Sequence, residues 1–189
     1  MSIALIWRVL LYTWFAFEVL LAVSTRTKRG QGKLGDRGSL QLLWLSIAFS
    51  ITAAMWIGAA NPHNFLAHKA WVPLLCLGLM VLGLVVRVVA VVSLGRAFSV
   101  NVAIRDEQKV KRDGLYALMR HPSYAGMLPL FLSVGLAQRN WISLAIMVVV
   151  PGAALLYRIH VEEIALREHF GQEYVDYSSQ TKRLIPGIY

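Results

Sequence analysis

The sequence has few charged residues and few of the residue types that define fibrous or disulfide-rich proteins. Only 15% of its 189 residues are charged, and it contains 14 glycines, six prolines and one cysteine. These numbers exclude a collagen-like chain, an intrinsically disordered chain and a disulfide scaffold. The single Cys76 lies in an apolar run, where we expect a small buried side chain. Soluble domains carry roughly 25% charged residues, so a soluble globular protein is excluded as well.

Hydrophobic residues, by contrast, make up 57% of the chain, and the mean hydropathy is +0.57. Five apolar segments cover residues 3–23, 40–60, 71–94, 123–138 and 140–157. A helix of about 20 such residues spans the roughly 30 Å of a bilayer core. The sequence therefore predicts an all-α integral membrane protein with about five transmembrane helices, of which the last two form a helical hairpin.

The placement of the basic residues predicts the orientation in the membrane. They are concentrated in residues 24–39, in residues 95–122 and in the C-terminal tail, whereas the other connections hold only Lys69 and Arg139. By the positive-inside rule, the N-terminus lies outside and the C-terminus in the cytoplasm. Basic residues next to the membrane interact with anionic lipid headgroups. The net charge of +9 is explained in this way, and no nucleic-acid partner is expected. We expect a multi-pass protein of the cell inner membrane whose active site faces the cytoplasm.

Three ionisable residues lie within the predicted spans. Arg8 and Arg87 are close to span ends, so we expect both side chains to extend to the interface and keep their charges in water. For Glu18 the sequence leaves two alternatives, a pair with a loop arginine or no partner. Residues 1–60 carry no recognisable chemistry and are expected to form a hydrophobic scaffold or a wall on which an acceptor docks.

The first chemical motif lies at the start of the fourth segment, in residues 113–126. Pro122 is typical of a first helical turn, so a helix is expected to begin there with free N–H groups and its positive dipole end. Arg120 and His121 lie at the same point. The motif predicts a site for a carboxylate or phosphate at the cytoplasmic surface. The alternative is that both side chains contact lipid phosphates.

The second motif covers residues 157–171, at the end of the fifth segment. An apolar stripe at helical spacing runs through Leu155, Ile159, Leu166 and Phe170. Glu162 falls inside this stripe and is predicted to face protein or ligand, with its charge balanced by Arg158 or by a cationic ligand. Glu163 lies at the edge of the stripe, where an exposed pair with Arg167 is as plausible as a functional role. The two motifs together predict a ligand that carries both charges.

Several strings in these motifs carry a family resemblance. An Arg-His-Pro-x-Tyr-x-Gly string at 120–126 follows Gly-Leu-Tyr at 114–116 and precedes Glu-Glu at 162–163 and Phe-Gly-x-x-Tyr at 170–174. On these residues, the C-terminal half of the chain, from Leu94 onward, resembles the isoprenylcysteine carboxyl methyltransferase family and its prokaryotic relatives. These are integral membrane enzymes that are related to the phospholipid N-methyltransferases.

The resemblance implies S-adenosylmethionine as cofactor and a prenylated or similar lipid-like acceptor that arrives from the bilayer. Carried onto matching positions, the implied cofactor site comprises Tyr116, Arg120, His121, Pro122, Tyr124, Glu162 and Glu163. The implied catalytic residues are Arg120 and Arg183, which would orient an acceptor carboxylate, and Glu162. Residues 97–101 and 181–186 differ from the corresponding residues of the eukaryotic members. These differences bear on the identity of the acceptor more than on the identity of the cofactor. No metal is implied.

These considerations divide the chain into a three-helix scaffold, residues 1–94, and a methyltransferase-like catalytic region, residues 95–189. Three alternatives stay open. A sterol-type membrane reductase would use NADPH, and a run of basic residues would bind the phosphate of this cofactor. The run consists of Arg105, Lys109, Lys111 and Arg112. A phospholipid N-methyltransferase would need Glu162 or His121 as a base for its amine acceptor. A membrane scaffold or transport accessory would have no catalytic site.

Overall fold

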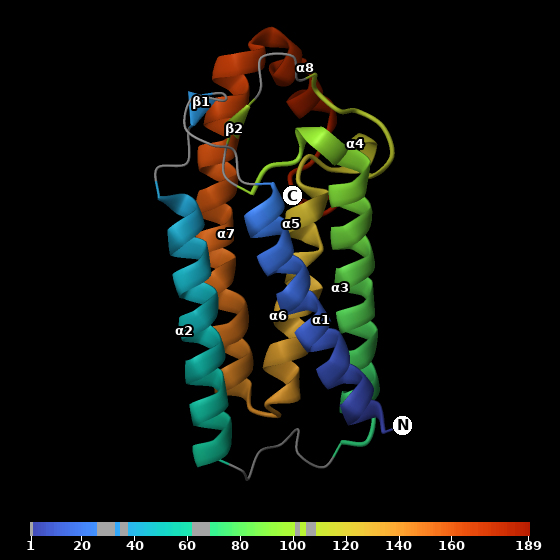
Figure 1. Cartoon of the computed structure of the whole chain (residues 1–189), viewed down its shortest axis with the longest axis vertical. Helices are drawn as coiled ribbons and strands as arrows, with labels where there is room; N and C mark the ends of the chain where they lie inside the picture. Colours follow the sequence, from blue (N-terminus) through green and yellow to red (C-terminus); the bar gives the residue numbers. More distant parts are fainter. Residues whose placement is uncertain (1, 26–32, 35–37, 62–68, 101–102, 105–108) are drawn as a thin grey trace.

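The structure is a computed structural model that describes residues 2–25, 33–34, 38–61, 69–100, 103–104 and 109–189. Within these residues, long helices run along the long axis of the molecule, and short elements gather at one end (Figure 1). The long helices are α1 (Ile3–Ser24), α2 (Ser39–Ala60), α3 (Val72–Leu94) and α7 (Trp141–Phe170). Two short strands, β1 (Lys33–Leu34) and β2 (Ala103–Ile104), pair in antiparallel fashion.

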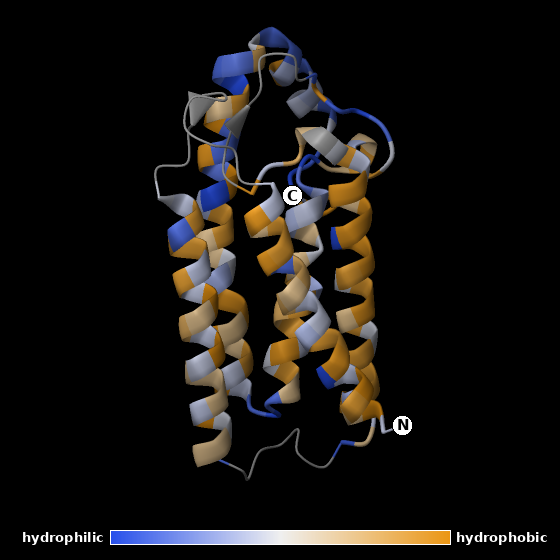
Figure 2. Cartoon of the chain, in the orientation of Figure 1, coloured by the Kyte–Doolittle hydropathy of each residue, from blue (hydrophilic) through white to orange (hydrophobic). Residues whose placement is uncertain are grey.

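The four long helices are each long and apolar enough to cross a membrane. In their most apolar windows only 11 to 39% of the residues are buried inside the molecule, so apolar side chains cover the outside. Figure 2 shows this hydrophobic band along the helices and hydrophilic residues at the end that carries the short elements. A shorter apolar stretch, Pro122–Ala137, lies between α3 and α7 in sequence. The predicted all-α membrane fold is confirmed, with four candidate spans and this shorter stretch.

The predicted helical hairpin differs from expectation in its first arm. The first arm consists of two helices, α5 (Pro122–Ala125) and α6 (Met127–Ala137). The second arm, α7, has 30 residues because the helix continues beyond the apolar segment 140–157 through the second motif, as the helical spacing of that motif predicts. The Asn140 side chain caps α7 by accepting hydrogen bonds from the N–H groups of Ile142 and Ser143. Gly171, with φ of +56°, ends it.

The remaining elements are η1 (Gly95–Ala97), α4 (Leu115–Leu118) and α8 (Gln172–Gln180). They lie at the end of the bundle where α7 extends beyond the other long helices (Figure 1). This end therefore collects both sequence motifs. Asn101, Arg105 and most basic residues of the 24–39 loop lie outside the described residues.

Two glycines bring α3 into close contact with the start of α5 and α6. A Cβ atom added at Gly126 would lie 2.8 Å from the backbone nitrogen of Arg87 and 2.9 Å from the carbonyl oxygen of Gly83. A Cβ atom added at Gly83 would lie 2.7 Å from the carbonyl oxygen of Gly126. Small residues allow such close backbone approach between membrane helices. The contact fixes the start of α5, and with it the first motif, against α3.

We expect Gly126→Ala to lower the free energy of unfolding by about 1–3 kcal/mol, because the added methyl group meets backbone atoms that cannot rotate away. Chemical unfolding of the purified protein in mixed detergent micelles measures this change. Gly78→Ala on α3 is the matched control, since a Cβ atom there meets nothing within 4 Å. Equal stability of both variants would contradict the close contact.

A buried ion pair connects α1 to α3 within the predicted membrane region. Glu18 and Arg87 are each 5% exposed, and the guanidinium donates from Nε to Oε1 and from Nη2 to Oε2, both at 2.9 Å. Trp14 Nε1 also donates to Glu18, at 3.1 Å. The expectation that Arg87 extends to the interface is therefore wrong, because its partner lies in the bundle. Glu18 pairs with this span arginine instead of a loop arginine, and Arg8 is exposed near the start of α1.

Candidate active site

The Arg120–His121 segment is held in place by the C-terminal part of the chain. The backbone N–H of Arg120 donates to the carbonyl of Lys182 at 2.8 Å, and that of His121 donates to the carbonyl of Arg183 at 3.0 Å. Met119 and Lys182 form a parallel bridge beside them. These two N–H groups are therefore occupied, and α5 has only four residues. Both N–H groups precede the helix start at Pro122, so the expected anion site there stays a prediction.

Glu163 is the centre of a buried charge network. Its side chain is 4% exposed, and its Oε1 accepts from Arg120 Nε at 2.9 Å and lies 3.4 Å from His121 Nε2. Its Oε2 accepts from Arg183 Nε at 3.1 Å and lies 3.0 Å from Arg183 Nη2. Arg167 approaches to 4.0 Å. The expected position of Glu163 at an exposed edge is therefore wrong, although its contact with Arg167 exists.

Two side chains outside the spans, those of Arg183 and Tyr177, have raised pKa values. The hydrogen bond between Arg183 and Glu163 raises the pKa of that guanidinium, so Arg183 stays charged at every physiological pH. Burial raises the pKa of Tyr177 to about 12, so its hydroxyl is protonated and donates to the carbonyl of Tyr116 at 2.6 Å. These contacts attach α8 and the following segment to α4 and α7. The ion pairs of Glu163 thus position Arg120 and His121.

Glu162, the neighbouring carboxylate, faces a cavity. Its side chain is 29% exposed, yet its Oε2 is buried and accepts no hydrogen bond within the described part of the chain. The His121 ring lies beside it, with Nδ1 3.9 Å from this oxygen. Arg158, the partner predicted from sequence, instead donates to Tyr124 Oη and to Ser39 Oγ, each at 2.9 Å. Glu162 faces a ligand space, as predicted, but the predicted pair with Arg158 is not the arrangement found.

The cavity beside Glu162, which we call the polar cavity, holds about 470 Å³ of empty space, part of which is open to solvent. Its lining comprises Leu94, Lys109, Val110, Lys111, Tyr116, Arg120, His121, Glu162, Leu166, Phe170, Tyr174 and Tyr177. The hydroxyl of Tyr174 is also buried without a hydrogen-bond partner among the described residues. Two polar atoms without partners therefore line one cavity, as expected of a site built for a polar ligand.

The polar cavity contains four of the residues expected at a cofactor site, namely Tyr116, Arg120, His121 and Glu162. The other expected residues do not line it. Pro122 is fully buried, Glu163 belongs to the charge network, and Tyr124 lines a different cavity. Arg183 contacts Glu163 and the hydroxyl of Tyr189, the latter at 2.9 Å.

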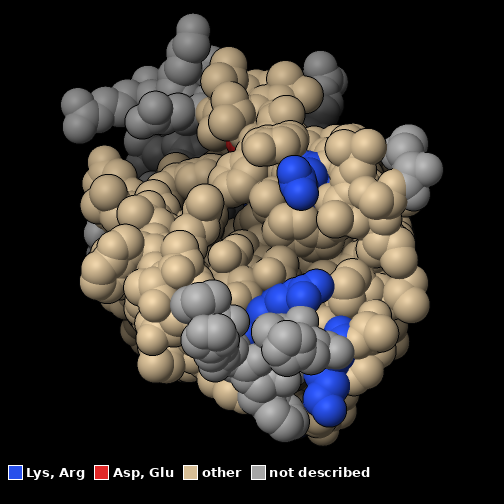
Figure 3. Space-filling view, turned by 90° about the horizontal axis from the view of Figure 1, so that it is seen from below, with Lys and Arg blue, Asp and Glu red and all other residues tan. Residues whose placement is uncertain are grey.

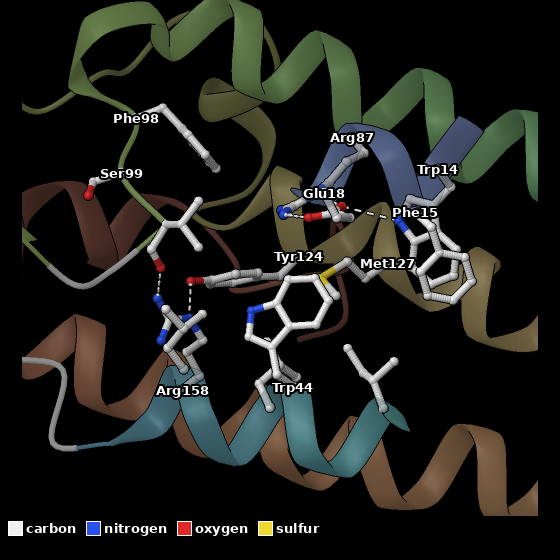
Figure 4. A pocket seen from close by; sticks show the side chains of 14 residues that line it. Trp14, Phe15, Glu18, Trp44, Arg87, Phe98, Ser99, Tyr124, Met127 and Arg158 are labelled. Atoms are coloured by element: carbon white, nitrogen blue, oxygen red, sulfur yellow. Dashed lines mark hydrogen bonds and ion pairs between the residues drawn. The ribbon is translucent and has the colours of Figure 1, made fainter. Parts of the chain in front are cut away.

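A second cavity, which we call the apolar cavity, lies between α1, α2, α3 and α7 and holds about 520 Å³ of empty space. Most of its lining is hydrophobic, and its polar side chains are those of the Glu18–Arg87 pair, Ser99, Tyr124 and Arg158. Figure 4 shows Tyr124 and Trp44 projecting into it between that ion pair and Arg158. Arg158 is 1% exposed and also donates to the carbonyl of Val100. This cavity suits an apolar ligand with an anionic end.

The two cavities meet at a pair of stacked rings. The ring centroids of His121 and Tyr124 are 5.7 Å apart, with an interplanar angle of 21°. His121 lines the polar cavity and Tyr124 lines the apolar cavity. The two cavities are therefore neighbours that are separated by this ring pair.

Sequence reasoning missed Trp44 and the Glu18–Arg87 pair as cavity residues. A glutamate and an arginine inside two apolar spans were a usable signal, because burial of both charges favours a mutual pair. The notion of residues 1–60 as a docking wall agrees with the part that α1 and α2 take in the apolar cavity.

Comparison with known proteins gives consistent matches. The isoprenylcysteine carboxyl methyltransferase family matches residues 76–168. Protein-S-isoprenylcysteine O-methyltransferase B of Arabidopsis thaliana is 33% identical over 173 residues, which are 90% of this chain and 86% of that protein. A probable protein-S-isoprenylcysteine O-methyltransferase of Oryza sativa subsp. indica is 33% identical over 112 residues, 58% of this chain and 59% of that protein.

A solved structure is similar as well. It is the eukaryotic intramembrane Ras methyltransferase, an isoprenylcysteine carboxyl methyltransferase, solved without a monobody. The TM-score is 0.65 and the sequence identity 27%, and the match covers 77% of this chain and 52% of that chain. The present chain thus spans about half the length of that protein.

Proposed function

Because the chain belongs to the isoprenylcysteine carboxyl methyltransferase family, we propose that it transfers a methyl group from S-adenosylmethionine to the carboxylate of a prenylated cysteine. The observation that carries this proposal is the pair of cavities that meet at His121 and Tyr124, one polar and one apolar. A polar cofactor and a lipid-like acceptor need two such spaces with a common boundary. No specific observation favours the reductase, the amine methyltransferase or the non-catalytic alternative.

The polar cavity fits S-adenosylmethionine in its charge pattern. The cofactor carries an ammonium group, and the buried Glu162 Oε2 without a hydrogen bond is an acceptor for it. The carboxylate of the cofactor would be held by basic side chains that line the same cavity, and Lys109 and Arg120 are candidates for this role. The hydroxyl of Tyr174 supplies a further donor. When bound, the cofactor supplies the methyl group on a sulfonium.

The apolar cavity would hold the prenyl chain, with the acceptor carboxylate toward Arg158 and Tyr124. A carboxylate is already ionised near pH 7 and needs no general base, so orientation is the main task of the protein. Arg158 is fixed for this task by its bonds to Ser39 and Tyr124. Arg183, assigned to the acceptor from the sequence, lines neither of these two cavities, whereas Arg158 lines the apolar cavity. We therefore assign the orienting role to Arg158.

The same proposal includes the arrangement in the membrane. The N-terminus lies outside, the C-terminus and the polar cavity face the cytoplasm, and the acceptor enters from the bilayer between α1 and α2, which both line the apolar cavity. The basic loops on the polar-cavity side support this orientation. The catalytic region is residues 95–189, with residues 1–94 as scaffold and acceptor wall, in the inner membrane of the cell.

Calorimetry with S-adenosylhomocysteine, which retains the ammonium group, tests the cofactor site on the detergent-solubilised protein. We expect binding to the wild type and a roughly tenfold to hundredfold loss of affinity in Glu162→Gln, because a bond to a charged group is lost. Glu168→Gln, an exposed position on the same helix, is the matched control and should bind normally. Binding of NADPH in place of S-adenosylhomocysteine would overturn the methyltransferase proposal.

The acceptor is tested by methyl transfer in the same preparation. A small S-prenylated cysteine with a blocked amine should form a base-labile methyl ester, and the same cysteine without its prenyl chain should not. An ethanolamine phospholipid as the methylated acceptor would instead indicate N-methylation.

A further inference from the structure

A third cavity lies at the end of the bundle opposite the polar cavity. It holds about 570 Å³ of empty space, and its lining comprises Ile3, Ala4, Trp7, Arg8, Val72, Pro73, Cys76, Ala137 and Arg139. These residues come from the start of α1, the start of α3, and the turn between α6 and α7. The methyl-transfer proposal uses none of them.

The walls of this cavity are connected by hydrogen bonds across three helices. Trp7 Nε1 donates to Ser133 Oγ at 2.8 Å, and Ser133 Oγ donates to the carbonyl of Cys76 at 2.7 Å. Val72 and Cys76 are 1% and 4% exposed and pack with Leu136. The cavity is therefore formed by α1, α3 and α6 before any ligand binds.

The charge of this end is exclusively basic. Two guanidinium groups, those of Arg8 and Arg139, line the cavity. The sequence stretches that form this end, within residues 1–17, 37–105 and 114–161, contain no aspartate or glutamate. Figure 3 looks onto this end and shows Lys and Arg side chains on a face with almost no acidic surface. Both arginines therefore favour an anionic occupant.

We propose that this cavity binds the phosphate of an anionic phospholipid of the opposite leaflet. Paired guanidinium groups hold a phosphate by charge-assisted hydrogen bonds, and basic pockets between membrane helices bind lipid headgroups. The apolar part of the lining, with Trp7, Val72 and Pro73, contacts the glycerol and upper acyl region. The acyl chains continue along the exposed apolar faces of α1 and α3, where Leu5 is 47% and Leu75 40% exposed. A soluble phosphate ion would not contact these apolar surfaces, whereas a phospholipid would.

Native mass spectrometry of the full chain in detergent tests the site with phosphatidylglycerol and phosphatidylcholine as probes. We expect one retained phosphatidylglycerol and weaker retention of phosphatidylcholine. Arg8→Gln and Arg139→Asn should each weaken phosphatidylglycerol binding at least about tenfold. Asparagine is chosen because Arg139 has a φ of +52°, which asparagine tolerates.

Lys69→Gln is the matched control, since Lys69 is a basic residue that is exposed near the start of α3 but does not line the cavity. It should retain the lipid. Equal retention in all variants overturns the proposal, and so does displacement of the lipid by millimolar inorganic phosphate. If a charge-removing variant fails to fold, Arg8→Lys and Arg139→Lys are used instead, because lysine keeps the charge. Loss of the preference for phosphatidylglycerol in these lysine variants would support a site that depends on the guanidinium geometry. Methyl transfer is read separately, so failure here leaves the proposed function untouched.

Discussion

Glu163→Gln is expected to reduce methyl transfer to background and to lower the free energy of unfolding by about 3–5 kcal/mol. The carboxylate is 4% exposed and balances Arg120, whose side chain is 9% exposed. Glutamine keeps the shape but leaves the buried guanidinium without a counter-charge, which costs more than the loss of one hydrogen bond. Arg183 is a third exposed and contributes less, because water screens it. Arg120 would keep its hydrogen bonds to the carbonyls of Ser178 and Thr181 but would lose the counter-charge that holds its Nε beside the polar cavity.

Two readouts separate this role from a simple loss of fold. Glu163→Asp keeps the charge with a shorter side chain, so it should retain more stability and part of the affinity for S-adenosylhomocysteine. Glu168→Gln on the exposed face of α7 should behave as the wild type in both assays. Thermal unfolding and calorimetry of the three variants measure the differences. Wild-type activity in Glu163→Gln would show that the network does not position Arg120 and His121.

The second large effect is expected at the intramembrane ion pair. Among the described residues, Arg87→Met leaves the Glu18 carboxylate, 5% exposed, with only the indole N–H of Trp14 as a hydrogen-bond donor. Glu18→Leu leaves the buried guanidinium without a counter-charge. Each single change should lower the free energy of unfolding by about 3–5 kcal/mol. The double change Glu18→Leu with Arg87→Met should cost less than either one, because no buried charge remains.

A double-mutant cycle from unfolding in mixed micelles measures this coupling. Arg8→Gln serves as the control, since Arg8 lies in the same apolar helix as Glu18 but is exposed. Its stability should change by less than about 0.5 kcal/mol, as for other surface positions. Additive losses in the double variant would mean that the two charges do not balance each other. Arg87 also donates to the carbonyl of Ser123 at 3.2 Å, so its single variant is expected to loosen the start of α5 as well.

The membrane-spanning helices could be predicted because the length and hydropathy of a segment are local properties of the sequence. Length and hydropathy alone define α1, α2 and α3 to within a residue or two, since a bilayer requires about 20 apolar residues in any span. The apolar segment ends near residue 157, whereas α7 continues as a polar helix to Gly171, as the helical spacing of residues 155–170 predicts. Hydropathy reports the membrane boundary, whereas the glycine determines where the helix ends.

The burial of Glu163 was not predicted, for a non-local reason. The apolar stripe on α7 indicates which face packs on the bundle, but it carries no information about the segment that returns as residues 181–184. Arg183 from that segment and Arg120 from the segment before α5 cover Glu163, while Glu162 is left beside the cavity. The same limit applies to Arg87, whose partner lies 69 residues earlier in the chain. Helical periodicity describes one helix at a time, and these contacts depend on three segments.

The pairing of residues 119–121 with residues 182–183 gives the assembly of this protein an order in time. Translation completes α3, α5, α6 and α7 before it reaches Lys182 and Arg183, and at about 5–20 residues per second this interval lasts seconds. During the interval Arg120 and His121 lack their backbone partners, and Glu163 lacks Arg183. The end that carries Arg120, His121 and Glu163 therefore closes only after residues 182–183 have been made, when all the long helices have already been synthesised.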